Sequence, residues 1–97
     1  MKTLEEIIKK LKDLKGEIEK KYKAEIVGVF GSFVRGEQKE GSDVDIIVRF
    51  HENATLFDFI RLSMFLQEKL GIDVDIVPQD TIRKELEERI MQEVVNI

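Results

Sequence analysis

The segment 29–50, VFGSFVRGEQKEGSDVDIIVRF, restricts the fold more than any other part of the sequence. It contains two apolar runs, and each has the length and composition of a buried strand. The first run ends at Gly31 and Ser32, and the second is entered through Asp43 and Asp45. If these two ends lie together, the strands must run antiparallel. The segment therefore predicts an antiparallel pair with a Gly-Ser turn beside two carboxylates.

Hydrophobic periodicity divides the rest of the chain into helices and strands. Apolar residues recur at helical spacing over 3–22, and Thr3 with Glu6 forms a capping box at the start of that segment. Gly71 is a natural C-cap, and Pro78 should stop the third strand. The elements expected after the first helix are a strand at 25–30, a helical turn at 32–36, a strand at 43–50, a helix at about 55–70, a strand at 72–77 and a helix at about 80–95.

This order predicts an α/β (α+β) fold with a small mixed sheet of about three strands and helices packed on it. The crossover from 43–50 through a helix to 72–77 should be parallel and right-handed, whereas 25–30 should be antiparallel to 43–50. With 97 residues, the chain is expected to form one domain, 1–97, with a small core.

Composition excludes several classes of protein. The net charge of −4 argues against direct binding to nucleic acid, which needs a basic face. Cysteine is absent, so neither a disulfide framework nor a thiolate metal site is expected. No apolar run is long enough to span a membrane, and the N-terminus is too charged for a signal peptide. We therefore expect a cytoplasmic protein.

Three aspartates are candidate metal ligands. Asp43 and Asp45 are two residues apart in an expected strand, so both side chains lie on one face. Asp75 lies in the strand expected beside this one, and Asp73 is an alternative third ligand or a loop cap. Neighbouring carboxylates repel unless a cation bridges them, and oxygen ligands suit Mg²⁺. Three carboxylates around two Mg²⁺ ions about 4 Å apart are the arrangement for in-line phosphoryl or nucleotidyl transfer. The opposite face of the strand at 43–50, which should enter the core, carries Val44, Ile46 and Val48.

The Gly-Ser turn is a candidate phosphate site. Gly31 would let backbone N–H groups approach a phosphate closely, and the Ser32 hydroxyl adds a donor. Arg35, one helical turn later, would reach the same phosphates or would instead form a surface ion pair with a nearby carboxylate. The aspartates and a bound triphosphate would both be negatively charged and would repel each other. Metal ions between them would remove this repulsion, so that both could occupy the same site.

These motifs resemble those of the minimal nucleotidyltransferases, a branch of the DNA polymerase β superfamily. Gly31 and Ser32 match the family's Gly-Ser pair, and Asp43 and Asp45 match its Asp-x-Asp after ten intervening residues. The stretch VDIV, with Asp75, resembles the strand of the third carboxylate, and IRKELEERIMQEVVNI is similar to the closing helix. The resemblance covers nearly the whole chain.

The resemblance implies transfer of a nucleotide from an NTP with release of pyrophosphate. Asp43, Asp45 and Asp75 would be the catalytic, metal-binding residues for two Mg²⁺ ions. Val34 replaces an alanine that is usual in the family motif. The residues expected to bind the nucleotide are Gly31, Ser32, Arg35 and Ser42.

The resemblance also implies a partner. Many minimal members are antitoxins of a small all-helical HEPN ribonuclease toxin, and they transfer AMP from ATP to a tyrosine of that toxin. The expected function is therefore Mg²⁺-dependent transfer of AMP from ATP to a hydroxyl of a partner protein. Two alternatives are an antitoxin that acts by binding alone and a nucleotidyltransferase with a small-molecule acceptor. The intact carboxylates weigh against the first alternative, and the lack of a second helical domain weighs against the other.

The apolar helix at 55–70 is expected to contribute mainly to the core. In so small a protein, three strands and the other helices cannot cover all of it. Part of its surface, or of the C-terminal helix, is therefore expected to form a partner interface. Self-association also stays open at this point.

Overall fold

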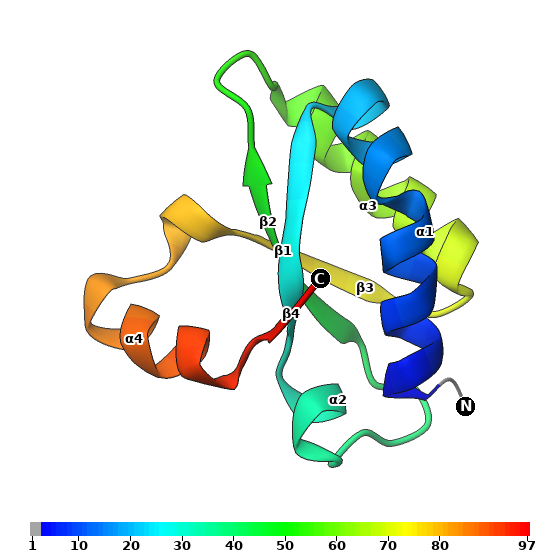
Figure 1. Ribbon diagram of the computed structural model, residues 1–97, viewed down its shortest axis with the longest axis vertical. Helices are drawn as coiled ribbons and strands as arrows, with labels where there is room; N and C mark the ends of the chain where they lie inside the picture. Colours follow the sequence, from blue (N-terminus) through cyan, green and yellow to red (C-terminus); the bar gives the residue numbers. More distant parts are fainter. Residues whose placement is uncertain (1–2) are drawn as a thin grey trace.

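The computed structural model describes residues 3–97, and the sheet with its flanking helices is shown in Figure 1. The order of elements agrees with the sequence-based prediction, apart from differences at the C-terminal end. The elements are α1 (Leu4–Tyr22), β1 (Ala24–Phe30), α2 (Ser32–Arg35), β2 (Val44–Phe50), α3 (Leu56–Leu70), β3 (Val74–Pro78), the 3₁₀ turn η1 (Gln79–Thr81), α4 (Lys84–Glu93) and β4 (Val95–Asn96).

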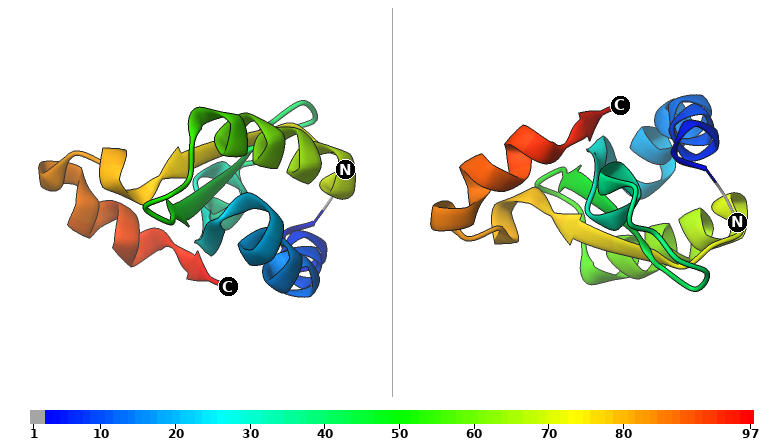
Figure 2. Two further views of the ribbon diagram at one scale, coloured as in Figure 1. Left: turned by 90° about the horizontal axis from the view of Figure 1, so that it is seen from above. Right: turned by 90° about the horizontal axis from the view of Figure 1, so that it is seen from below.

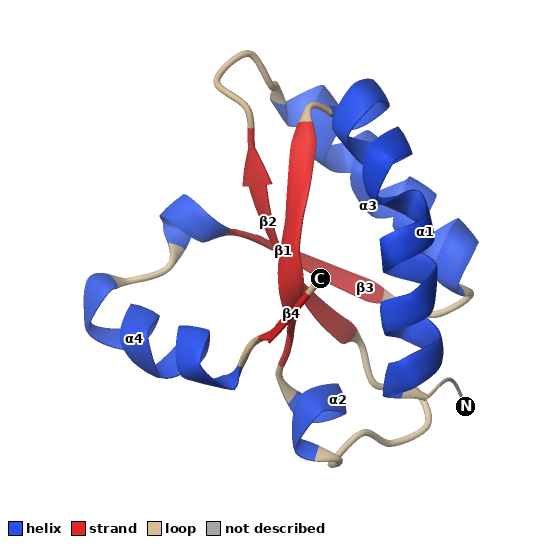
Figure 3. Cartoon of the chain, in the orientation of Figure 1, coloured by secondary structure: helices blue, strands red, loops and turns tan. Residues whose placement is uncertain are grey.

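The strands form a mixed sheet in the order β3-β2-β1-β4 (Figure 3). β1 is antiparallel to β2, as the Gly-Ser and Asp-x-Asp segments predict. β2 is parallel to β3, with α3 as the crossover. Both expected strand directions are thus confirmed, and the ends of β1, β2 and β3 that carry the motifs meet at one side of the sheet.

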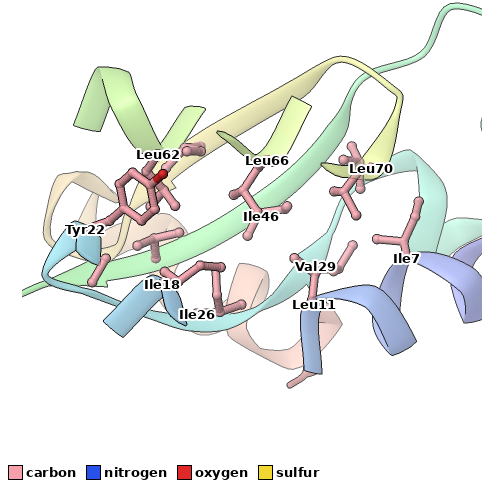
Figure 4. Packing of buried hydrophobic residues seen from close by; sticks show 14 of the residues in the cluster. Ile7, Leu11, Ile18, Tyr22, Ile26, Val29, Ile46, Leu62, Leu66 and Leu70 are labelled. Atoms are coloured by element: carbon pink, nitrogen blue, oxygen red, sulfur yellow. The ribbon is translucent and has the colours of Figure 1, made fainter. Parts of the chain in front are cut away.

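The helices form two layers around this sheet. α1 and α3 pack against each other and cover one face, whereas α4 lies on the other side (Figures 1 and 2). Leu11 and Ile18 of α1 and Leu62 and Leu66 of α3 are fully buried against strand residues such as Ile46 (Figure 4). The core therefore lies between the sheet and the α1–α3 layer.

Both long helices begin at capping boxes. The Glu6 N–H donates to the Thr3 hydroxyl over 3.2 Å, while the Thr3 N–H donates to the Glu6 carboxylate over 3.3 Å. In α3, the Thr55 N–H donates to Asp58 over 2.8 Å. Each box satisfies backbone N–H groups that a helix start leaves unpaired. α3 ends at Gly71, whose φ of 67° is the left-handed conformation expected of a C-cap.

The predicted last helix was wrong at both ends, and the predicted sheet lacked a strand. The chain first forms η1, and α4 begins only at Lys84 and ends at Glu93. Val95 then pairs with β1, next to Gly28. A Cβ atom at Gly28 would collide with the Val95 carbonyl oxygen and the Val94 side chain. β4 can therefore form because β1 has no side chain at that position, which helical periodicity alone does not reveal. Among the described residues, no helix is long and apolar enough to cross a membrane.

We expect two chemically identical substitutions to have opposite effects on stability. Gly28→Ala should lower the free energy of unfolding by about 1–3 kcal/mol, because the added methyl group displaces β4. Gly16→Ala should raise it by about 0.5–1 kcal/mol, because Gly16 lies within α1 with no atom near the new methyl group. Urea unfolding measures both changes. Hydrogen exchange at the Ile97 amide, which donates to Val27, should accelerate only in Gly28→Ala. Unchanged protection there would contradict this account of β4.

Candidate active site

The sheet register places two of the predicted carboxylates side by side. In the parallel pair, Asp45 of β2 lies opposite Asp75 of β3. In the antiparallel pair, Asp45 lies opposite Phe30, the last residue of β1. Gly31 follows Phe30 directly, so the Gly-Ser turn and the two carboxylates converge at the same end of the sheet.

An open cleft of about 460 Å³ lies over this convergence, between the sheet and α4. Its apolar walls are Phe30, Leu86 and Ile90. The glycine and the charged residues that line it are Gly31, Arg35, Asp45, Asp75, Arg89 and Glu93. The cleft is therefore on the sheet face away from the hydrophobic core.

Gly31 is required by both its conformation and its surroundings. Its φ of 83° favours glycine, and a Cβ atom there would collide with the Asp45 carboxylate. The Gly31 carbonyl accepts hydrogen bonds from the N–H groups of Val34 and Arg35, each over 3.1 Å, which starts the single turn of α2. The absence of a side chain thus brings the backbone of the turn against the carboxylate.

The cleft disfavours the ionised form of Asp45. Burial is the main cause that raises the pKa of this carboxyl group, and the negative charges of Asp75 and Asp43 raise it further. The charge of Arg35 acts in the opposite direction. A cation between Asp45 and Asp75 would relieve this repulsion, and carboxylate oxygens are suitable ligands for Mg²⁺. The paired carboxylates therefore fit a divalent metal.

Asp43 lies at the edge of this arrangement. It immediately precedes β2, its side chain is exposed, and it does not line the cleft, although its charge reaches Asp45. Within residues 3–97, no group of three or more acidic, His or Cys side chains is arranged to hold a metal ion. The structure thus brings together Asp45 and Asp75, and the three-carboxylate site stays a prediction.

Arg35 already has two carboxylate partners. Its guanidinium group donates to Glu37 over 2.7 Å and to Glu93 over 2.6 Å. The second ion pair connects α2 to the last residue of α4. This geometry favours the surface ion pair that the sequence left as an alternative, and a role of Arg35 in nucleotide binding stays a prediction.

Arg89 is the cleft residue that the sequence analysis missed. It projects from α4, lines the cleft, and forms no ion pair in the part of the chain that the structure describes. The sequence did contain a signal that could have identified it. Leu86, Ile90 and Glu93 are four and three residues apart, so they lie on one face of the helix. Arg89 is next to Ile90 in the sequence and borders this face, so it was a candidate for the same site.

The two predicted serines occupy different surroundings. Ser32 is the first residue of α2 and follows the cleft residue Gly31 without itself lining the cleft. None of the side-chain hydrogen bonds found within residues 3–97 uses its hydroxyl. Ser42, in contrast, accepts a hydrogen bond from the Lys39 N–H over 2.8 Å and lines a separate cavity with Asp73. The structure therefore does not place Ser42 or Asp73 in the cleft that contains Asp45.

Comparisons with known sequences give a consistent result. The model of the nucleotidyltransferase domain family matches residues 4–97. The protein adenylyltransferase MntA of Thermococcus cleftensis is 42% identical over 97 residues, which cover 100% of this chain and 98% of that protein. A relative from Methanocaldococcus jannaschii, named as a protein adenylyltransferase, is 43% identical over 82 residues, or 84% of this chain and 95% of its own length.

Solved structures show the same similarity. One structure, named as a minimal nucleotidyltransferase, superposes with a TM-score of 0.80 at 35% identity, covering 95% of this chain and 94% of its own. A toxin–antitoxin structure with AMP-PNP matches with a TM-score of 0.66 at 26% identity, covering 95% of this chain and 69% of that one.

The raised pKa of Asp45 predicts how stability depends on pH. The folded protein holds a proton on Asp45 more tightly than the unfolded chain does. The free energy of unfolding should therefore fall as pH rises from the ordinary carboxyl value of 3.8 through the raised value. Asp45→Asn should remove this decline and make the protein without metal at least as stable as the wild type at pH 7. Urea unfolding of both proteins in EDTA, repeated at a series of pH values, measures these free energies of unfolding.

The matched control for this experiment is Asp13→Asn, which changes an exposed carboxylate on α1. It should leave the decline of stability with pH in place. An Asp45→Asn protein that unfolds far more easily than the wild type at pH 7 would show that Asp45 supports the fold instead.

Proposed function

Because this chain belongs to the nucleotidyltransferase domain family and is a nucleotidyltransferase enzyme, we propose that it transfers AMP from ATP to a hydroxyl group of a partner protein. The observation that carries this proposal is the register that sets Asp45 beside Asp75 at a glycine turn. A pair of carboxylates next to a closely approachable backbone suits a metal-bound triphosphate better than a neutral ligand.

The proposed reaction exchanges one phosphorus–oxygen bond for another. The acceptor hydroxyl oxygen attacks the α-phosphorus of ATP, and the bond from this phosphorus to the oxygen that bridges to the β-phosphate breaks. Pyrophosphate leaves with the electrons of that bond. We assign the hydroxyl proton to Asp75, which is the more exposed carboxylate of the pair.

The carboxylates and the glycine turn at the cleft have distinct roles in this proposal. Asp45 and Asp75, with Asp43 at the edge, would hold Mg²⁺, which would neutralise phosphate charge and align the triphosphate for in-line attack. Gly31 leaves room for a phosphate against the backbone, and the Ser32 hydroxyl donates to it.

Arg89 is the cation that we assign to the phosphates. The charge of Arg35 is already balanced by Glu37 and Glu93, whereas Arg89 forms no ion pair within residues 3–97. A triphosphate carries several negative charges, and the cleft itself contributes three carboxylates. An arginine without a protein partner is therefore available to bind the leaving pyrophosphate.

The relatives support a protein acceptor. The similar Thermococcus and Methanocaldococcus proteins are named as protein adenylyltransferases, and the toxin–antitoxin structure contains the ATP analogue AMP-PNP. We therefore infer that the acceptor is a small helical toxin of the HEPN type and that this chain is its antitoxin. Docking of the toxin would hold the hydroxyl in line with the α-phosphate.

Mass spectrometry of the toxin tests this function. After incubation of the cognate toxin with this chain, ATP and Mg²⁺, the toxin should gain the mass of AMP, and excess EDTA or Asp45→Asn should prevent the gain. A toxin that is inhibited in a stable complex without modification would favour action by binding alone. If neither modification nor a complex is found, the acceptor is not this toxin, and small hydroxyl compounds become the candidates.

The assignment of Arg89 predicts a change in substrate binding. Arg89→Ala should raise the KM for ATP about tenfold or more, as expected when a hydrogen bond to a charged group is lost. Arg35→Ala should raise it less, because that arginine is already paired. Arg83→Ala is the matched control, since Arg83 precedes α4 and does not line the cleft. Steady-state kinetics over a range of ATP concentrations measures all three, and equal effects of Arg83→Ala and Arg89→Ala would contradict the assignment.

A further inference from the structure

The side of α4 that faces the cleft carries an accessible apolar side chain. Leu86, Ile90 and Glu93 follow one face of this helix, and all three line the cleft. Leu86 is 43% exposed. Within residues 3–97, it is the only exposed large apolar side chain that lines the cleft, because the others belong to α3. The fold therefore leaves an apolar surface uncovered inside the proposed active site.

The Gly-Ser turn lies at the opposite end of α4 from Leu86. Glu93, the last residue of this helix, accepts a hydrogen bond over 2.6 Å from Arg35, in the helical turn that follows Gly31. Leu86 precedes Glu93 by seven residues, which corresponds to about 10 Å along a helix. Figure 1 likewise shows the end of α4 nearer to α2 than its beginning. The cleft thus extends from Leu86 at one end to the Gly-Ser turn at the other.

The distribution of charge along the cleft favours one orientation of a nucleotide. The proposed function assigns the triphosphate to Gly31, to Arg89 and to metal held by the carboxylates. Arg89 is three residues closer to the Gly-Ser end of α4 than Leu86 is. The base is uncharged, and its two flat faces are largely apolar, so it suits a leucine side chain. The reverse orientation would place several negative charges against Leu86, which has no hydrogen-bond donor in its side chain.

Phe30 is the other apolar residue against which a base could pack. It pairs with Asp45 in the register of β1 and β2, and it directly precedes Gly31. The space over Phe30 is therefore the space that the phosphates and their metal need. Leu86 belongs to α4, across the cleft from the sheet, so a base packed against it leaves that space free.

We propose that Leu86 contacts the base of the bound nucleotide, with one face of the base packed against the leucine side chain. This inference rests on the proposed function, which supplies the triphosphate at the other end of the cleft. The contact removes apolar surface of both groups from water, which is favourable by roughly 25 cal/mol for each Å². Leu86 is thus the residue by which the cleft distinguishes a nucleoside triphosphate from the same phosphates without a base.

Calorimetric titration with two ligands tests this contact. The ligands are ATP and ribose 5-triphosphate, which is ATP without its base, each with Mg²⁺ and without an acceptor. Leu86→Ala should weaken the binding of ATP about three- to tenfold, as expected when roughly 30–50 Å² of apolar contact is lost, and should leave that of ribose 5-triphosphate unchanged. Arg89→Ala should weaken both ligands. Leu56→Ala is the matched control, because it shortens an exposed leucine outside the cleft, and it should weaken neither.

Tryptophan fluorescence gives a second measurement, because the chain has no tryptophan of its own. Leu86→Trp should bind ATP at least as tightly as the wild type, since an indole ring stacks on a base. Its fluorescence should fall when ATP binds and stay constant when ribose 5-triphosphate binds. Leu56→Trp, with its indole on α3, should show neither change beyond the absorbance of the added nucleotide.

Two results would overturn the inference. The first is a Leu86→Ala protein that binds ATP like the wild type. If this variant then binds the toxin more weakly, Leu86 contacts the acceptor and not the base. The second is an equal loss of affinity for ATP and for ribose 5-triphosphate, which would mean that Leu86 supports the shape of the cleft.

These outcomes are separate from those of the proposed function, because neither titration requires transfer. A chain that binds ATP through Leu86 but leaves every toxin unmodified would contradict the proposed function alone. A chain that modifies the toxin, while Leu86→Ala keeps full affinity for ATP, would contradict this inference alone. A wild type that binds neither ligand in the presence of Mg²⁺ would contradict both.

Discussion

The parallel register between β2 and β3 is the constraint on which the active site depends, because it holds Asp45 beside Asp75. The two carboxylates repel, and burial of Asp45 adds to the unfavourable energy of its charge. The core on the opposite face of the sheet maintains the register. Ile46 and Ile76, also paired in register, are buried there, and a slip by one residue would bring polar residues into the core. Hydrophobic packing on one face thus enforces an electrostatically unfavourable arrangement on the other, which a bound cation would relieve.

The outer wall of the cleft depends on different contacts. α4 has no buried residue, so its position is determined mainly by its two ends. At its C-terminus, Glu93 pairs with Arg35, and β4 pairs with β1 at Gly28. η1 contacts β2 before its N-terminus. A glycine in β1 and an ion pair to α2 therefore position the helix that brings Arg89 to the cleft.

The sheet separates two kinds of surface. Charged and polar groups of the proposed reaction are on the α4 side, whereas the exposed apolar side chains Leu56, Phe57, Ile60 and Met64 belong to α3 on the other side. Within residues 3–97, α3 is the helix with the most exposed large apolar side chains, although its other side is buried in the core.

The sequence by itself determined the order of the elements, the strand directions and the segments that carry the carboxylates and the glycine turn. These follow from local signals: the period of apolar residues, the capping residues at Thr3 and Gly71, and two aspartates spaced for one face of a strand. Only the tertiary structure decided where α4 ends, that Val95 pairs with β1, that Arg35 meets Glu93 and that Arg89 rather than Ser42 lines the cleft. Each of these depends on a contact between residues far apart in the chain. Helical periodicity and local motifs do not show which residue from a distant segment will lie beside a given position. They also do not show where a glycine will leave room for such a segment.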